Sequence, residues 1–198
     1  MKIVGVCCSA QKKKTTWYAL DACMKAIRED YPQIYTVTID LAEKEVNACK
    51  ALNHCAKSLT CGQKDDFNEL IPILSDPDLG GLIVATPVYM GAMSGQCKAF
   101  LDRCVMFRRN GFLFRNKVGG VIAVGGFRNG GQEVAIQSVH AVMLVQDMIV
   151  VGDGKPGAHF GGTMWSGHPE GIEHDEKGLE TVRNLGRRVA EVALKMSQ

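Results

Sequence analysis

The sequence predicts an α/β protein built on a doubly wound parallel sheet of five strands in the order 2-1-3-4-5. Short apolar runs recur without the period-two alternation of a half-exposed strand, so helices are expected to cover both faces of the sheet. Segments of helical periodicity separate these runs and give a helical crossover between successive strands. We expect one domain over residues 1–198, with an irregular insertion at about 47–65 and a long loop at about 153–174.

The composition is that of an ordinary globular protein, 46% hydrophobic and 22% charged. The net charge of +2 is too small to argue for nucleic acid or an anionic membrane surface as a partner. No apolar run approaches the ~20 residues of a membrane span. The N-terminus, Met1 to Ser9, resembles a buried strand more than a signal peptide. We therefore expect a cytoplasmic protein with reduced thiols.

The N-terminal part of the chain predicts a strand, a helix and a second strand. Residues 2–7 are an apolar run of strand length, and the polar loop 8–16 follows it. The next helix ends near Glu29, and its buried side chains recur at helical spacing: Leu20, Met24 and Ile27. Pro32 breaks this pattern, and residues 33–39 form the second strand.

The middle of the chain contains the third strand. Residues 40–65 show a poor pattern, whereas residues 67–74 predict a short helix. The third strand is the apolar run that ends at Thr86-Pro87, and a helix begins near Ser94. The buried face of that helix is marked by residues at helical spacing: Cys97, Phe100, Leu101 and Cys104.

The C-terminal part completes the alternation of strands and helices. Residues 119–125 predict the fourth strand, and the glycine-rich loop 126–133 leads into a helix that reaches about Val145. Residues 148–152 form the fifth strand. Asp175 is placed to cap the last helix. The apolar face of this helix carries Leu179, Val182, Leu185 and Val189.

The eight cysteines fall into two groups. Five lie in apolar periodic patterns and are expected to be small core residues: Cys7, Cys8, Cys23, Cys97 and Cys104. The other three, Cys49, Cys55 and Cys61, lie in the irregular insertion. Their function is a separate question from that of the core thiols.

Three loops follow the first, third and fourth strands and are expected to meet where the strand order reverses. The first offers hydroxyls, lysines and a helix N-terminus, which favour an anion such as a phosphate monoester. The second offers Tyr89 and Met90 for apolar contact and glycines for close backbone approach. The third offers backbone donors with Arg128 and Gln132. Each alone can be an ordinary surface turn, but together they describe a site for a mononucleotide with a wide planar ring.

These loops resemble the NADPH-dependent FMN reductase superfamily. Residues 86–96 with Lys98-Ala99-Phe100-Leu101-Asp102-Arg103 are similar to the family's second flavin loop, and Gly125-Gly126 with Gly130-Gly131-Gln132-Glu133 is similar to its third. Ser9 to Trp17 occupies the place of the phosphate loop. The branch that the chain most resembles comprises the iron–sulfur flavoproteins and the multimeric flavodoxins related to tryptophan-repressor-binding-protein quinone reductases. The resemblance implies a flavodoxin-like fold that binds FMN.

The resemblance also implies how FMN is held. The residues expected to hold or flank the phosphate are Ser9, Lys12, Lys14, Thr15, Thr16 and Trp17. Those expected to line the isoalloxazine ring are Thr86, Pro87, Val88, Tyr89, Met90 and Gly91. Those expected to face the pyrimidine edge are Gly125, Gly126, Arg128, Gly130 and Gly131. No side chain is assigned as a catalytic acid or base, because the flavin carries the redox chemistry.

The chain departs from the family pattern in two places. The family's first loop often reads Gly-Ser-Pro-Arg with a later Gly-Asn-Thr. Several of those positions are changed here, at Cys8, Ala10, Gln11, Lys14 and Thr15. Iron–sulfur flavoproteins carry C-x2-C-x2-C-x5-C for a [4Fe–4S] cluster, and the four positions here are Cys49, Leu52, Cys55 and Cys61. Leucine cannot ligate iron and four thiolates are the usual requirement, so Leu52 argues against a [4Fe–4S] cluster.

The three remaining thiols leave several interpretations open. We favour a lost cluster with leftover thiols, so no metal ligand is assigned. A cluster on three thiolates with a nonprotein or open fourth site is a second interpretation. A zinc site with His54 is a third, although His54 and Cys55 are adjacent, unlike normal zinc spacings. A thiol redox switch is a fourth.

The resemblance implies an FMN-dependent oxidoreductase. Such a protein moves electrons from NAD(P)H or a reduced carrier to a quinone, a flavin or a protein acceptor. The alternative is a non-enzymatic electron carrier, similar to flavodoxin or to an iron–sulfur flavoprotein. A flavin-free interaction protein is a third possibility, because the first loop is altered. The family commonly forms oligomers, so a homodimer or homotetramer is expected.

Overall fold

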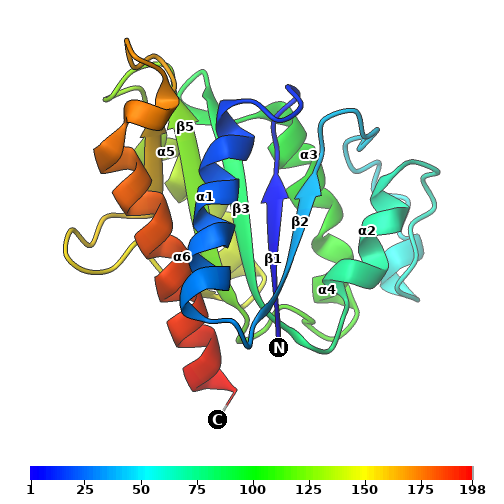
Figure 1. Ribbon diagram of the computed structural model, residues 1–198. Helices are drawn as coiled ribbons and strands as arrows, with labels where there is room; N and C mark the ends of the chain where they lie inside the picture. Colours follow the sequence, from blue (N-terminus) through cyan, green and yellow to red (C-terminus); the bar gives the residue numbers. More distant parts are fainter. Residues whose placement is uncertain (198) are drawn as a thin grey trace.

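The computed structural model describes residues 1–197, and the parallel strands of its sheet follow the order β2-β1-β3-β5-β6 (Figure 1). This is the predicted order 2-1-3-4-5. The strands are β1 (Lys2–Cys7), β2 (Tyr35–Asp40), β3 (Leu79–Tyr89), β4 (Ala92–Met93), β5 (Val118–Gly125), β6 (Ile149–Val150) and β7 (Gly162–Trp165). The helices are α1 (Thr15–Asp30), α2 (Phe67–Leu74), α3 (Gly95–Arg103), α4 (Val105–Arg109), α5 (Gln132–Val145) and α6 (Glu176–Met196).

Helices cover both faces of the sheet. On one face α1 packs against α6, as Figure 1 shows. The residues predicted for the inner faces of α1 and α6 belong to the core cluster on this side. A second core cluster on the other face includes side chains of α2, α3, α4 and α5. The five cysteines predicted as core residues are at most 1% exposed, which confirms that assignment.

Most element boundaries agree with the sequence. The helix α2 covers Phe67–Leu74 as expected, and α6 begins after Asp175, whose carboxylate accepts a hydrogen bond from the Gly178 N–H as an N-cap. In the poorly patterned residues 40–65, the structure has one 3-10 turn at His54–Ala56. Within residues 1–197, no helix is long and apolar enough to cross a bilayer.

The fifth strand differs from the prediction because it consists of two pieces. Only Ile149–Val150 of the predicted strand 148–152 is present, as β6, and it pairs with Val118 and Gly119 of β5. The chain then leaves the sheet and returns as β7, which pairs with the carboxyl half of β5. Thus β7 lies inside the segment predicted as a loop at 153–174. Its four residues Gly-Thr-Met-Trp are too short to form a recognisable apolar run.

The segment predicted as a loop after the third strand is a β-hairpin. β3 continues past Thr86-Pro87 to Tyr89, and β4 pairs back on it through Val88–Met93 and Tyr89–Ala92. The turn residues Met90 and Gly91 have φ of 49° and 75°, the left-handed combination that matches the twist of a two-residue hairpin. The following helix is interrupted at Cys104, so α3 and α4 are separate.

Candidate functional site

The carboxyl ends of β1, β3 and β5 are adjacent, so the three predicted loops lie at one edge of the sheet. Ser94 joins the first two loops. Its Oγ donates to the Cys8 carbonyl over 2.8 Å and accepts from the Cys97 N–H over 3.1 Å, which also caps α3. The Ser94 N–H in turn donates to Thr86 Oγ1 over 3.0 Å. The Thr86 side chain is completely buried. Thr86 therefore fixes the backbone of the second loop, and the Ser94 hydroxyl connects that loop to the first.

The second and third loops touch at Gly91 and Gly131. A Cβ added at Gly131 would lie 3.3 Å from the Gly91 Cα and 3.4 Å from Val88 Cγ1, and Gly131 has φ of +90°. Both the backbone angle and the close approach favour glycine there. The buried Gln132 amide shapes the third loop, because its Oε1 accepts from the Gly130 N–H over 2.8 Å. Its Nε2 donates to the Phe127 carbonyl over 2.6 Å.

The first loop places its polar groups in different environments. Ser9 and Thr16 are buried, and Ser9 Oγ accepts from the Gln11 N–H over 3.2 Å. Lys12 pairs with Glu43 over 2.5 Å, whereas Lys14 is exposed. Helix α1 begins without a hydrogen bond from an N-cap side chain. The first-turn amides of α1 are therefore the part of this loop best suited to an anion.

Trp17 and the hairpin provide apolar surface near this edge. The Lys13 ammonium lies 5.9 Å from the Trp17 ring centroid. At the hairpin tip, Tyr89 is 51% exposed and Met90 fully exposed, so both are free to contact a planar ligand. Pro87 and Val88 are half-buried below them.

Arg128 is held by groups that sequence reasoning did not connect to it. Its guanidinium pairs with the buried carboxylate of Asp175 and lies 5.6 Å from the ring centroid of Trp165. Trp165 Nε1 donates to the Gly126 carbonyl over 2.9 Å. Asp175 thereby connects the third loop to the start of α6. The contact of Arg128 with the pyrimidine edge stays a prediction, as do the other assigned ligand contacts.

The Asp175 carboxylate is buried and is held by three hydrogen-bond donors. Burial works to raise its pKa, but the Arg128 guanidinium and the N–H groups of Trp165 and Gly178 lower it below the ordinary value. The backbone N–H of Trp165 points away from the sheet on the edge strand β7. It donates a hydrogen bond to the Asp175 carboxylate over 2.7 Å. The backbone N–H of Thr163, also on β7, donates a hydrogen bond to Thr181 Oγ1 of α6 over 3.0 Å. Side chains of α6 and its cap therefore satisfy this edge of the sheet.

A cavity of about 710 Å³ lies beside the third loop, between the starts of α5 and α6. Its lining includes Arg128, Gln132, His159, Thr163 and Lys177. Of the residues assigned to FMN, only Arg128 and Gly131 belong to this lining. The cavity is therefore a different space from the edge where the three loops meet.

The three cysteines of the insertion line one hollow. Cys49, Cys55 and Cys61 share it with Leu52 and His54. Cys49 is exposed, Cys55 and Cys61 are half-buried, and all eight cysteines of the chain are free thiols. Within residues 1–197, no three His, Cys, Asp or Glu side chains are arranged to hold a single metal ion. The structure therefore brings the three thiols around one hollow without assembling a single-ion site among the described residues.

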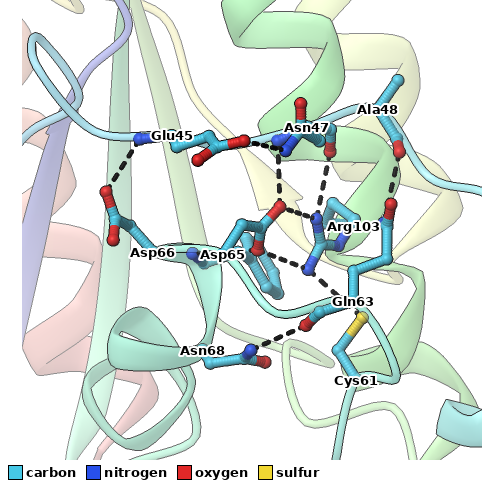
Figure 2. Close-up of polar contacts among 10 residues, drawn as sticks. Glu45, Asn47, Ala48, Cys61, Gln63, Asp65, Asp66, Asn68 and Arg103 are labelled. Carbon is cyan, nitrogen blue, oxygen red and sulfur yellow. Dashed lines mark hydrogen bonds and ion pairs between the residues drawn. The ribbon is translucent and has the colours of Figure 1, made fainter.

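Two arginines donate to these thiols. Arg103 Nη2 lies 3.2 Å from Cys61 Sγ, and Arg109 Nη1 lies 3.3 Å from Cys55 Sγ. Figure 2 shows the first of these contacts beside the pair formed by Arg103 and Asp65. Sequence reasoning missed both donors. The only available signal was that Arg103 ends the motif of the second loop.

The core thiols have a different character. Burial raises the pKa of Cys7 to about 12 and that of Cys23 to about 12. Burial also raises the pKa of Cys8 well above its ordinary value, with hydrogen bonding to Cys97 as a further cause. Thiols of this kind stay protonated and are poor ligands. The chemistry-bearing cysteines are therefore those of the insertion.

Comparison with known proteins places these features in context. The family model described as NADPH-dependent FMN reductase matches residues 1–163. An iron–sulfur flavoprotein of Methanocaldococcus jannaschii is 43% identical over 192 residues, 97% of each chain. One from Methanosarcina thermophila is 38% identical over 192 residues, covering 97% of this chain and 95% of the relative.

Solved structures share the fold. A flavodoxin-type, WrbA-like protein of Agrobacterium tumefaciens superposes with a TM-score of 0.66 at 20% identity, covering 98% of this chain and 97% of that one. An NADH:FMN oxidoreductase in its apo form gives a TM-score of 0.68 at 17% identity, covering 96% of this chain and 88% of that one. The fold is therefore flavodoxin-like, as expected.

The relatives correct the interpretation of the cysteines. Because the relatives at 36–43% identity are named iron–sulfur flavoproteins, our expectation that Leu52 argues against a cluster is wrong. Leu52 remains unable to ligate iron. The error was to treat the four-thiol set as indivisible, whereas three free thiols still line one hollow and two of them accept guanidinium donors.

Proposed function

The chain belongs to the NADPH-dependent FMN reductase family, and from that premise we propose that it is an electron-transfer protein binding FMN and an iron–sulfur cluster. The observation that carries this proposal is the hollow lined by Cys49, Cys55 and Cys61 in a chain whose relatives are named iron–sulfur flavoproteins. When bound, the two groups accept and release electrons, and the protein positions and tunes them.

The three loops supply the proposed FMN site. The amides at the start of α1, with Ser9, Lys14 and Thr15, bind the phosphate. The hairpin residues from Thr86 to Gly91 lie against the ring, and the glycines at 125–126 and 130–131 face its edge. The contacts of Ser94 with Cys8 and of Gly131 with Gly91 support this assignment, because they hold the three loops together.

The insertion supplies the proposed cluster site. Cys49, Cys55 and Cys61 provide three thiolates, and Leu52 contributes none. His54, Asn53 and Gln63 are other polar side chains that line the hollow. Asp65, at the end of the insertion, pairs with Arg103 at the end of α3. The cysteines lie on an irregular segment, and this ion pair attaches its C-terminal end to helix α3.

Helix α3 connects the two sites. Ser94 at its N-cap holds the first two loops, and Arg103 at its end contacts Cys61. Nine helical residues rise by about 13 Å, at 1.5 Å for each residue. The two proposed sites therefore lie at opposite ends of one helix.

The relatives' names favour the carrier over the NAD(P)H-dependent enzyme that the sequence first led us to expect. Steady-state oxidation of NADPH or NADH with a quinone or free flavin separates the two. A carrier consumes NAD(P)H slowly under these conditions. Rapid turnover would replace the carrier with the oxidoreductase.

A cysteine variant tests the cluster proposal. Anaerobically purified protein is expected to contain FMN, iron and acid-labile sulfide. Cys55→Ser is expected to lose iron and sulfide but keep FMN, whereas Ser58→Ala, in the same segment, keeps all three. Wild-type protein with FMN but no iron would refute the cluster, and protein with neither would refute the whole proposal.

The chain is also proposed to form a homodimer or homotetramer. Helix α5 leaves Val134, Leu144 and Val145 between 56% and 63% exposed, and these apolar side chains are candidates for a contact between copies of the chain. Light scattering after size exclusion measures the assembly. A monomer at micromolar concentration would contradict this expectation.

A further inference from the structure

Arg103 is a buried cation at the boundary between α3 and the insertion. The side chains of Arg103 and Asp65 are each 1% exposed. The pair is bidentate, with Nη1 to Oδ2 at 2.6 Å and Nη2 to Oδ1 at 2.9 Å. Nη1 also donates to the Asn47 carbonyl over 3.0 Å, and the guanidinium lies 4.6 Å from the Phe67 ring centroid. These contacts fix the guanidinium in a single orientation (Figure 2).

This orientation presents an N–H group to Cys61. Nη2 lies 3.2 Å from Cys61 Sγ, while the carboxylate of Asp65 balances the charge. Burying an arginine is costly unless its donors are satisfied. The sulfur atom is therefore one of the partners that complete the hydrogen bonding of Arg103.

A second arginine makes the same kind of contact to another thiol. Arg109 on α4 donates from Nη1 to Cys55 Sγ over 3.3 Å and to Asn53 Oδ1 over 3.3 Å. Arg109 is exposed, and among residues 1–197 it forms no ion pair. Two of the three thiols of the hollow thus face a guanidinium, and both donors come from the consecutive helices α3 and α4.

We propose that Arg103 and Arg109 are positioning residues that donate to the cluster thiolates of Cys61 and Cys55 and raise the reduction potential of the cluster. The inference rests on the proposed function. Reduction transfers one electron from a reduced carrier to the cluster and its ligands, breaks no bond and increases their negative charge. Donors aimed at the ligating sulfurs stabilise the more negative state, so reduction becomes easier.

Arg109→Gln tests this with little risk to folding, because Arg109 is exposed. The matched control is Arg108→Gln, which removes the same charge from the same helix, where Arg108 lies 5.2 Å from the Phe112 ring centroid. In anaerobic redox titrations of cluster-loaded protein, Arg109→Gln is expected to shift the reduction equilibrium severalfold toward the oxidised cluster. A tenfold shift equals 59 mV for one electron. Arg108→Gln is expected to match the wild type.

Arg103→Lys gives a second measurement. Lysine keeps the positive charge but loses the planar pair of donors, so the potential is again expected to fall while iron and sulfide are retained. The melting temperature is recorded in parallel, because a purely structural role would lower it without moving the potential.

The outcomes separate the two proposals. Wild-type protein without iron refutes the proposed function. Iron in the wild type with equal potentials in Arg109→Gln and Arg108→Gln overturns this inference alone. Loss of iron from folded Arg109→Gln also overturns the redox role, because Arg109 would then act in cluster assembly.

Discussion

The pair of Arg103 and Asp65 gives the sharpest stability prediction. Asp65→Asn keeps the shape of the side chain but removes the negative charge beside a guanidinium that is 1% exposed. One oxygen is replaced by an NH₂ group, which meets donors from Arg103 and from the Asn47 N–H, itself bonded to Asp65 over 3.0 Å. Breaking a buried pair from one side costs about 3–5 kcal/mol. We therefore expect the free energy of unfolding to fall by about that amount.

Urea denaturation of the metal-free protein, followed by far-ultraviolet circular dichroism, measures this loss. The control is Asp66→Asn, because the Asp66 carboxylate accepts only an exposed bond from the Glu45 N–H over 2.8 Å. We expect the control to cost less than about 1 kcal/mol. Equal stabilities of the two variants would refute the assignment of the Arg103–Asp65 ion pair as the contact that fixes the insertion to α3.

The pH dependence follows from the same carboxylate. Burial works to raise the pKa of Asp65, but Arg103 and the N–H groups of Asn47 and Phe67 lower it below its ordinary value of 3.8. A lowered native pKa adds stability that is present above the unfolded value and is lost as the pH falls through the native value. Wild-type stability is therefore expected to fall below about pH 4. Asp65→Asn lacks this contribution and shows a shallower decline.

Three further variants address the loops and the hollow. Ser94→Ala removes the α3 cap and the contact with Cys8, so we expect stability to fall by about 1–2 kcal/mol and FMN binding to weaken. Thermal denaturation and FMN titration measure these effects, and unchanged results would contradict the prediction. Gly131→Ala places a Cβ 3.3 Å from the Gly91 Cα at a backbone φ of +90°, so we expect the free energy of unfolding to fall by about 1 kcal/mol. We also expect weaker quenching of FMN fluorescence, and quenching equal to that of the wild type would count against the three-loop site. Leu52→Cys supplies a fourth thiol and is expected to slow the loss of iron in air, and unchanged loss would place Leu52 outside the cluster site.

Local patterns predicted most of the fold because the determinants of these elements lie in adjacent residues. Helix α2 and the cap at Asp175 are examples. The return of the chain as β7 was missed because its four residues gain strand pairing only from β5. The hairpin at Met90 and Gly91 was missed because Thr86-Pro87 was taken as the end of the strand.

For the candidate site too, the sequence predicted some features and missed others. The three loops could be predicted because parallel strands bring their carboxyl ends together. The contacts of Arg103 with Cys61 and of Arg128 with Asp175 could not be predicted, since they join residues 42 and 47 positions apart. The cysteine set was misjudged because a complete four-thiol pattern was required, whereas the relatives that match the chain are named iron–sulfur flavoproteins.

The central claim is that one chain carries two redox groups, one at each end of α3. An anaerobic reductive titration of the purified protein, with FMN measured on the same sample, tests it most directly. We predict uptake of one more electron per chain than the FMN content explains, accompanied by iron and sulfide. Uptake that FMN alone accounts for would contradict it.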